Sequence, residues 1–174
     1  ENWQDHVKKG CYPDCDMLPL GHLGKGFGQE WACSLTHEEQ RTMITLWCMF
    51  RSPLMLGCEL TKLDEWTKSL ITNRSLLSLL KEDRHGRQLV RTDTVAIWVN
   101  ESKNGGVLCV ALFNLKDCEA KLSIDYKELI EDITEDDELE LWDLWEDFKI
   151  QTHHQTIETD VAPHGVKVYL CTSA

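Results

Sequence analysis

Two aspartates with one residue between them lie near the start of the chain, inside the run Gly10–Leu18 (GCYPDCDML). If this run is extended, Asp14 and Asp16 point to the same side, because side chains alternate along a strand. A rise of roughly 3.3 Å per residue then separates them by about 6.6 Å. That spacing is at the lower edge of the roughly 6.5–9.5 Å between the two carboxyl groups of inverting glycosidases. A catalytic acid/base pair made of Asp14 and Asp16 is therefore one hypothesis, and the rest of the sequence favours another.

The segments that must position this pair follow the order strand, helix, strand, helix. A short strand is expected at Asp14–Leu20. Thr36 and Glu39 match a capping box and predict a helix that runs to about Arg51, where Ser52-Pro53 ends it. Alternating strands and helices are typical of an α/β fold with a parallel sheet. The other expected elements are a buried strand at Pro53–Leu60 and helices at Asp64–Thr72 and Arg74–Lys81, with Asp64 and Asn73 as N-caps.

From about residue 86 the pattern changes to short apolar or alternating runs separated by turn residues. Lys103–Gly106 (KNGG) is a hairpin signal, and the regular spacing predicts an antiparallel β-sandwich. We therefore expect two parts, an incomplete parallel part at residues 1–85 and a sandwich at residues 86–174. The expected strands are Arg87–Arg91, Val95–Glu101, Val107–Asn114, Ala120–Asp125, Leu139–Leu144, Thr156–Val161 and Val166–Thr172.

The first part has too few strands to complete a sheet. Two parallel strands and their helices make only a slice of a parallel sheet, whose other strands must come from elsewhere. The chain also begins at Glu1 rather than Met. We therefore expect that further strands precede it in a longer protein.

Composition excludes several classes of partner. The net charge of −12 argues against nucleic-acid binding, because phosphates need cationic side chains. No apolar run approaches the roughly 18 residues that predict a membrane span. The eight acidic residues between 128 and 140 predict a solvated loop rather than a calcium site. The pair His153-His154 predicts a surface position rather than a metal site.

The eight cysteines have irregular spacings, and some, such as Cys48, lie in apolar runs. We expect free thiols, hence a reducing compartment and a cytoplasmic location. A zinc site made of Cys11, Cys15 and His22 would lack a fourth ligand, so we expect no metal and no cofactor. The four glycines within Gly21–Gly28 do not match a phosphate-binding loop, and we expect a flexible loop there.

Several runs, in order along nearly the whole chain, resemble the C-terminal part of α-galactosidases of glycoside hydrolase family 27. They are similar above all to the bacterial members related to α-galactosidase and α-N-acetylgalactosaminidase. The runs are Tyr12–Gly21 (YPDCDMLPLG), Leu35–Thr42 (LTHEEQRT), Leu46–Cys48 (LWC), Arg51–Met55 (RSPLM), Asn73–Leu79 (NRSLLSL), Leu141–Trp145 (LWDLW) and Val161–Val166 (VAPHGV).

The resemblance implies a (β/α)8 TIM barrel followed by an antiparallel β-sandwich, with Asp14–Leu20 and Pro53–Leu60 as the seventh and eighth barrel strands. Members of the family cleave terminal α-galactosides with retention. They use a nucleophilic Asp and a second carboxylate, at the ends of the fourth and sixth strands. Both positions would precede Glu1. We therefore expect no catalytic residue in this chain and no activity of the chain alone.

The resemblance also gives roles to the seventh-strand motif. It implies that Asp16 and Met17 line the sugar pocket and that Asp14 supports them. A carboxylate accepts hydrogen bonds from sugar hydroxyls, and Met provides an adaptable apolar wall. Cys15 and Tyr12 depart from the residues usual at their positions. The choice between galactose and N-acetylgalactosamine therefore stays open.

An alternative is a non-catalytic carbohydrate-binding β-sandwich module. Trp98, Trp142 and Trp145 would then stack on sugars, whereas the simpler interpretation packs them in a core. A third hypothesis is an autonomous hydrolase that uses Asp14 and Asp16. If the barrel is incomplete, uncovered apolar faces such as Met43–Phe50 predict that the isolated chain self-associates.

Overall fold

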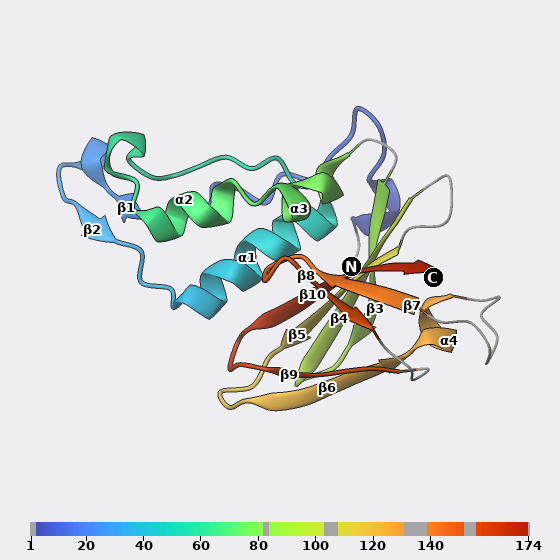
Figure 1. Ribbon diagram of the computed structural model, residues 1–174. Helices are drawn as coiled ribbons and strands as arrows, with labels where there is room; N and C mark the ends of the chain where they lie inside the picture. The colour runs from blue at the N-terminus through green and yellow to red at the C-terminus, as the bar shows by residue number, and fades with distance from the viewer. Residues whose placement is uncertain (1–2, 82–83, 103–107, 131–138, 152–155, 174) are drawn as a thin grey trace.

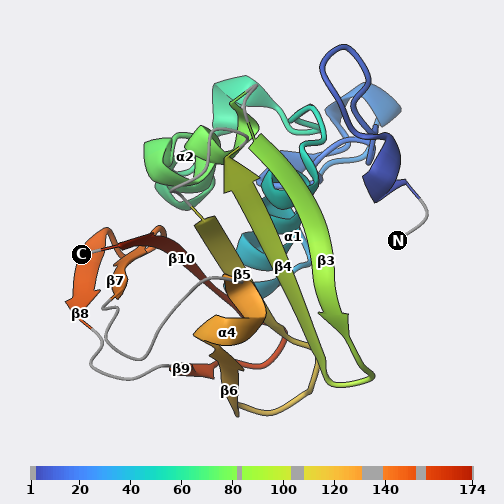
Figure 2. The same ribbon diagram turned by 90° about the vertical axis from the view of Figure 1, so that its right-hand side faces the viewer.

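The computed structural model describes residues 3–81, 84–102, 108–130, 139–151 and 156–173. The fold has three layers, in which a layer of helices lies against one face of a six-stranded antiparallel sheet (Figure 1). A two-stranded sheet and a short helix, α4 (Tyr126–Leu129), cover the opposite face (Figure 2). The two sheets make the expected β-sandwich.

The helical layer is built around α1 (His37–Phe50). The predicted capping box is present, because Thr36 Oγ1 accepts from Glu39 N at 3.2 Å and Glu39 Oε2 accepts from Thr36 N at 2.7 Å. Arg51, in the left-handed region, ends the helix. The next two helices are α2 (Glu65–Ile71), capped by Asp64, and α3 (Arg74–Leu77), capped by Asn73 as predicted. The 3₁₀ helices are η1 (Gln4–His6), η2 (Lys25–Phe27), η3 (Leu60–Lys62) and η4 (Ser78–Leu80).

The six-stranded sheet has the order β3-β4-β5-β10-β7-β8, and every pairing in it is antiparallel. Each predicted strand from residue 84 onward is present. One strand, β8, was not predicted. The bounds are β3 (Arg84–Arg91), β4 (Val95–Ser102), β5 (Leu108–Asn114), β7 (Leu139–Asp143), β8 (Phe148–Gln151) and β10 (Val166–Ser173), with β6 (Ala120–Asp125) and β9 (Thr156–Val161) in the second sheet.

Both faces of the six-stranded sheet are buried at the central strands β4 and β5, and this explains the continuous apolar runs of those strands. In β5, Cys109, Ala111 and Phe113 pack on the helical side, and the residues between them pack on the β6–β9 side. The helical-side core joins Leu18, Ile44 and other helical-layer residues to the sheet. The helices and the sheet therefore share one core.

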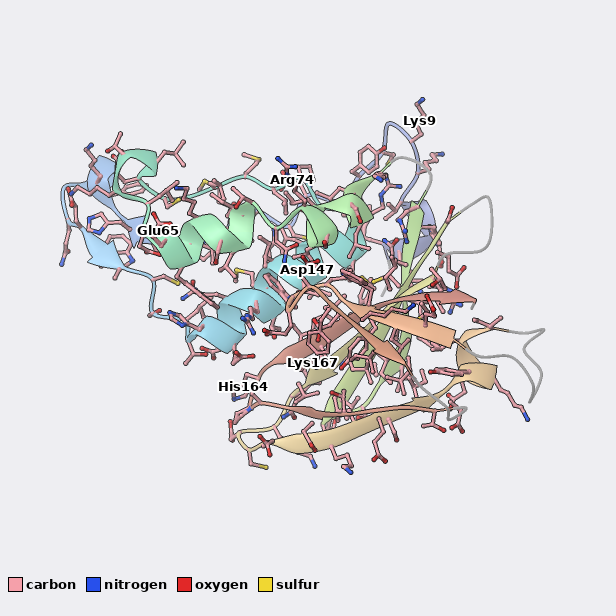
Figure 3. All side chains as sticks on the ribbon, in the orientation of Figure 1. Lys9, Glu65, Arg74, Asp147, His164 and Lys167 are labelled. Atoms are coloured by element: carbon pink, nitrogen blue, oxygen red, sulfur yellow. The ribbon has the colours of Figure 1, made fainter. Side chains whose placement is uncertain are left out.

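The contacts between the layers are close. An ideal Cβ added to Gly86 of β3 would lie 1.7 Å from the carbonyl oxygen of Met49 in α1, so only glycine fits there. At the other end of α1, Thr42 Oγ1 donates to the carbonyl of His164 at 2.7 Å. Figure 3 shows Asp147, in the β7–β8 turn, near the helical layer. In the same turn the Leu144 carbonyl accepts from Asn73 Nδ2 at 2.9 Å.

The two predicted parallel strands, Asp14–Leu20 and Pro53–Leu60, are not assigned as strands. They are joined by one isolated parallel bridge, Leu18–Leu56. Leu18 N donates to Met55 O at 2.7 Å, and Gly57 N to Leu18 O at 3.0 Å. The expected extended geometry at Asp16 is wrong, since its φ is +71°. Local side-chain bonds compete with strand pairing here, and Pro19 has no N–H to offer.

The run Gly21–Gly28, expected to be a flexible loop, is instead the first part of a short hairpin. Its strands are β1 (His22–Leu23) and β2 (Trp31–Ala32), with η2 between them. Three predictions fall wholly or largely outside the described residues: the Lys103–Gly106 hairpin signal, the acidic run at 128–140 and the His153-His154 surface position.

Candidate functional site

The motif at residues 14–17 is a compact turn held by its own carboxylates. Asp14 Oδ1 accepts from Asp16 N at 2.9 Å, and Asp16 Oδ1 accepts from Met17 N at 2.6 Å. The indole Nε1 of Trp47 donates to Asp16 O at 3.1 Å, which ties the turn to α1. Both aspartates are exposed. The positive φ of a non-glycine residue at Asp16 is a conformation that clusters at functional sites.

Met17 lies outside the helical-side core that its neighbours join. Leu18 and Leu20 are fully buried in the helical-side core, whereas Met17 is 51% exposed. In the neighbouring segment Leu56 packs against the same core, and Met55 is also 51% exposed. The two methionines therefore mark an open apolar face, next to the exposed carboxylate of Asp16.

Asp14 also faces a different cavity. It lines a pocket of about 550 Å³ together with Tyr12, Cys15 and Phe50. The guanidinium of the buried Arg51 lies 5.0 Å from the centre of the Tyr12 ring. Neither Asp16 nor Met17 lines this pocket. The structure thus joins the two aspartates by a hydrogen bond but directs them to different surroundings.

The hairpin that follows the motif is tied to the segment after the bridge. Glu30 Oε2 lies 2.6 Å from Lys62 Nζ and 2.5 Å from His22 Nε2. The hydrogen bond from Lys62, and then that from His22, lower the pKa of Glu30 to about 2. Lys25 likewise lowers the pKa of Glu59, to about 2. The residue pattern did not predict this arrangement. The one signal was a pair of opposite charges, Lys25 inside the glycine-rich run and Glu30 just after it.

The three tryptophans of the binding-module hypothesis do not form a common platform. Trp98 is 6% exposed and packs edge-to-face on Phe50, with ring centroids 5.6 Å apart. Trp145 is half-buried and donates from Nε1 to Thr45, with Arg41 over its ring at 5.5 Å. Only Trp142 is substantially exposed, at 39%. The disposition of Trp98 and Trp145 favours the packing interpretation.

All eight cysteines are free, as predicted. Burial raises the pKa of Cys48 and of Cys171 to about 12, so neither is an available thiolate. Within the described residues no group of three His, Cys, Asp or Glu side chains is arranged to hold a metal ion. None of the helices in those residues is long and apolar enough to cross a membrane.

Comparison with known proteins adds to this geometry. The family described as the alpha galactosidase C-terminal beta sandwich domain matches residues 92–171. A GH27 β-L-arabinopyranosidase of Geobacillus stearothermophilus superposes with a TM-score of 0.89, is 34% identical, and covers 99% of this chain. The chain corresponds to the C-terminal portion of a glycoside hydrolase family 27-like α-galactosidase. Alpha-galactosidase 2 of Arabidopsis thaliana is 23% identical over 174 aligned residues, and the alignment covers 99% of this chain.

A Bacillus halodurans protein with the provisional name alpha-N-acetylgalactosaminidase is also similar to the family 27-like chain. It is 32% identical, covers 100% of the chain and superposes with a TM-score of 0.85. The chain spans about two fifths of these relatives: 41% of the Arabidopsis protein, and 40% and 42% of the two bacterial structures. The relatives are glycoside hydrolases by name.

Proposed function

We propose that this chain belongs to a retaining glycoside hydrolase that acts on terminal α-galactosides. The observation that carries the proposal is the match of 99% of the chain both to a family 27 enzyme, at 34% identity, and to a protein named alpha-galactosidase, at 23% identity. The exposed Asp16–Met17 turn supports it, because an exposed carboxylate beside an apolar wall suits a sugar ring with hydroxyls on one edge.

We further propose that residues 1–85 are the last strands and helices of a (β/α)8 barrel, and that residues 86–174 are its C-terminal sandwich. The Leu18–Leu56 bridge supports this proposal, because it is parallel, as barrel pairings are. The Asp14–Leu20 and Pro53–Leu60 segments would then gain full strand pairing only beside further strands.

Within such a barrel, Asp16 accepts hydrogen bonds from sugar hydroxyls and Met17 packs against the sugar ring. Asp14 acts through Asp16, since its carboxylate holds the Asp16 amide at 2.9 Å. The nucleophile and the acid/base carboxylate come from outside residues 1–174. The chain alone is therefore inactive. Met43–Phe50 is covered by the helical-side core, so the expected self-association now rests on the open apolar face marked by Met17 and Met55.

Two measurements test these statements on the 174-residue chain. Incubation with an aryl α-galactoside should give no turnover above background, and turnover at a rate typical of glycosidases would contradict the proposal. Light scattering should show a species larger than a monomer. A clean monomer would contradict the self-association.

The role of Asp16 is tested in a protein that carries the chain together with the catalytic carboxylates. Asp16→Asn should lower kcat/KM about 10- to 100-fold, the effect of weakening a hydrogen bond to a charged group worth about 1.5–3 kcal/mol. Asp147→Asn is a matched control, because Asp147 also has a positive φ, of 55°, but lies in the β7–β8 turn. Equal losses in both variants would refute the assignment.

The names of the relatives supply the substrate panel. The experiment compares kcat/KM for three substrates with the same aryl leaving group. They are the α-galactoside, the β-L-arabinopyranoside and the α-N-acetylgalactosaminide. We expect the α-galactoside to give the highest kcat/KM. A higher value for either of the other two would redirect the substrate assignment while keeping the hydrolase class.

A further inference from the structure

Trp31 of β2 is a large aromatic side chain outside the Asp14–Met17 motif. It is 49% exposed, although it lies in a strand paired with the buried Leu23. An ideal Cβ added to Gly24 would lie 2.1 Å from Cζ3 of the Trp31 ring and 2.5 Å from Cε3. The indole therefore packs directly on the Gly24 backbone, which only a residue without a side chain permits. The rest of the ring is open to solvent.

The support under this ring is fixed at several points. The φ of Gly24 is +83°, and the turn that it begins is closed by Phe27 N donating to Gly24 O at 2.8 Å. The ion pairs of Glu30 with Lys62, and of Lys25 with Glu59, connect the hairpin to the segment that follows the Leu18–Leu56 bridge. Each exposed pair contributes little stability alone, but together they hold the hairpin in one position.

The indole nitrogen distinguishes Trp31 from most other tryptophans. In the parts of the chain that the structure describes, Nε1 of Trp31 has no acceptor. Four other indoles donate to a protein oxygen: Trp47 to Asp16, Trp66 to Gln40, Trp142 to Asp147 and Trp145 to Thr45. Trp31 therefore offers a free donor on the edge of an exposed ring.

We propose that Trp31 is a stacking platform for a sugar ring on the leaving-group side of an α-galactosyl oligosaccharide. The inference rests on the proposed function. A pyranose has an apolar C–H face and a hydroxyl-rich edge, which match the open indole face and the free indole donor at its edge. Leu23, which pairs with Trp31 in the hairpin, follows Met17 by six residues. Six residues span at most about 21 Å, a distance that a short oligosaccharide can cover.

Binding to the 174-residue chain tests the platform without any need for catalysis. The probes are raffinose, in which two further sugar units follow the galactosyl unit, and methyl α-galactoside, which has none. In ¹⁵N NMR titrations the Trp31 indole resonance should shift saturably with raffinose and not with methyl α-galactoside. No shift with raffinose, or equal shifts with both sugars, would overturn the proposal.

Variants separate stacking from a structural role. Trp31→Ala should weaken raffinose binding about fivefold, and Trp31→Phe, which keeps a planar ring, should retain most of it. Phe148→Ala is the matched control, because Phe148 is 48% exposed but lies in β8. Unchanged raffinose binding in Trp31→Ala, or an equal loss in Phe148→Ala, would refute the platform.

Kinetics in a protein that also carries the catalytic carboxylates distinguish this proposal from the proposed function. Trp31→Ala should raise KM for raffinose about fivefold and leave hydrolysis of α-galactosyl fluoride, which has no sugar aglycone, within twofold of wild type. Equal effects on both substrates would refute the platform and keep the hydrolase. No wild-type hydrolysis of either substrate would refute the hydrolase, and the NMR titration would still decide the platform.

Discussion

Replacing Gly86 by alanine should separate the sheet from the helical layer. The added Cβ would lie 1.7 Å from Met49 O and 2.9 Å from Met49 C. Carbon–oxygen contacts are usually no shorter than about 3.3 Å, so β3 and α1 must move apart by about 1.6 Å. Because the obstacle is a backbone carbonyl in the last turn of α1, no side-chain rotation can relieve the contact.

The displacement would also weaken a second link across the same gap. Arg51, which ends α1, donates from Nη1 to the carbonyl of Arg84 in β3 at 2.5 Å. Overpacking a well-packed core costs about 1–3 kcal/mol, and we expect Gly86→Ala to lie in the upper half of that range. For a chain of this size, that loss corresponds to a Tm about 5–10 °C lower.

Urea unfolding followed by circular dichroism measures the change in the free energy of unfolding. Gly26→Ala is the matched control, because nothing lies within 4 Å of the Cβ position at Gly26. Its stability should stay within about 0.5 kcal/mol of wild type. If Gly86→Ala also stayed within that range, the close approach of β3 and α1 would be wrong.

Three further predictions concern a cap, a salt-linked hairpin and the thiols. Asn73→Asp keeps the acceptor of the α3 cap but loses the donor to the Leu144 carbonyl, so it should lower the free energy of unfolding by about 1 kcal/mol. Asn73→Ala loses both and should lower it by about 2 kcal/mol, as measured by urea unfolding. Because the pKa of Glu30 is lowered from 4.5 to about 2, the order of the hairpin should be complete above pH 4.5 and decline as the pH falls towards 2. Amide shifts of the hairpin should follow this titration, and Glu30→Gln should remove the part due to Glu30 while the part due to the Lys25–Glu59 pair remains. With a thiol reagent, the exposed cysteines should react in the folded chain and the buried ones only after unfolding, and rapid reaction of a buried one would contradict the core. The exposed cysteines are Cys11 and Cys118, and the buried ones are Cys48, Cys109 and Cys171.

The elements that the sequence predicted correctly depend on short-range signals. The capping box of Thr36 and Glu39 lies within four residues, and it formed as expected. The apolar run of β5 reveals a strand buried on both faces, whatever lies next to it. In contrast, β8 contains only two apolar residues among four (FKIQ), and its pairing with β7 is what makes it a strand.

The elements that were missed depend on distant partners or on single backbone angles. The Asp14–Leu20 and Pro53–Leu60 segments have strand-like composition, but each finds only one paired residue in the other. At the candidate site, the three residues that the motif assigns to a sugar pocket, Asp14, Asp16 and Met17, are all exposed. The motif did not predict the left-handed backbone at Asp16, since that angle results from the bonds of two carboxylates to neighbouring amides.

The core that α1 shares with the sheet limits where a chimera of such proteins can be joined. Ile44 and Met49 of the helix pack with Trp98, Phe113 and other residues of the sheet in one fully enclosed cluster. A graft that moved residues 86–174 alone to another barrel would expose that apolar face and leave Gly86 against a foreign helix. A chimera between relatives should therefore exchange α1 and the sandwich as one block, and its junction should precede Thr36.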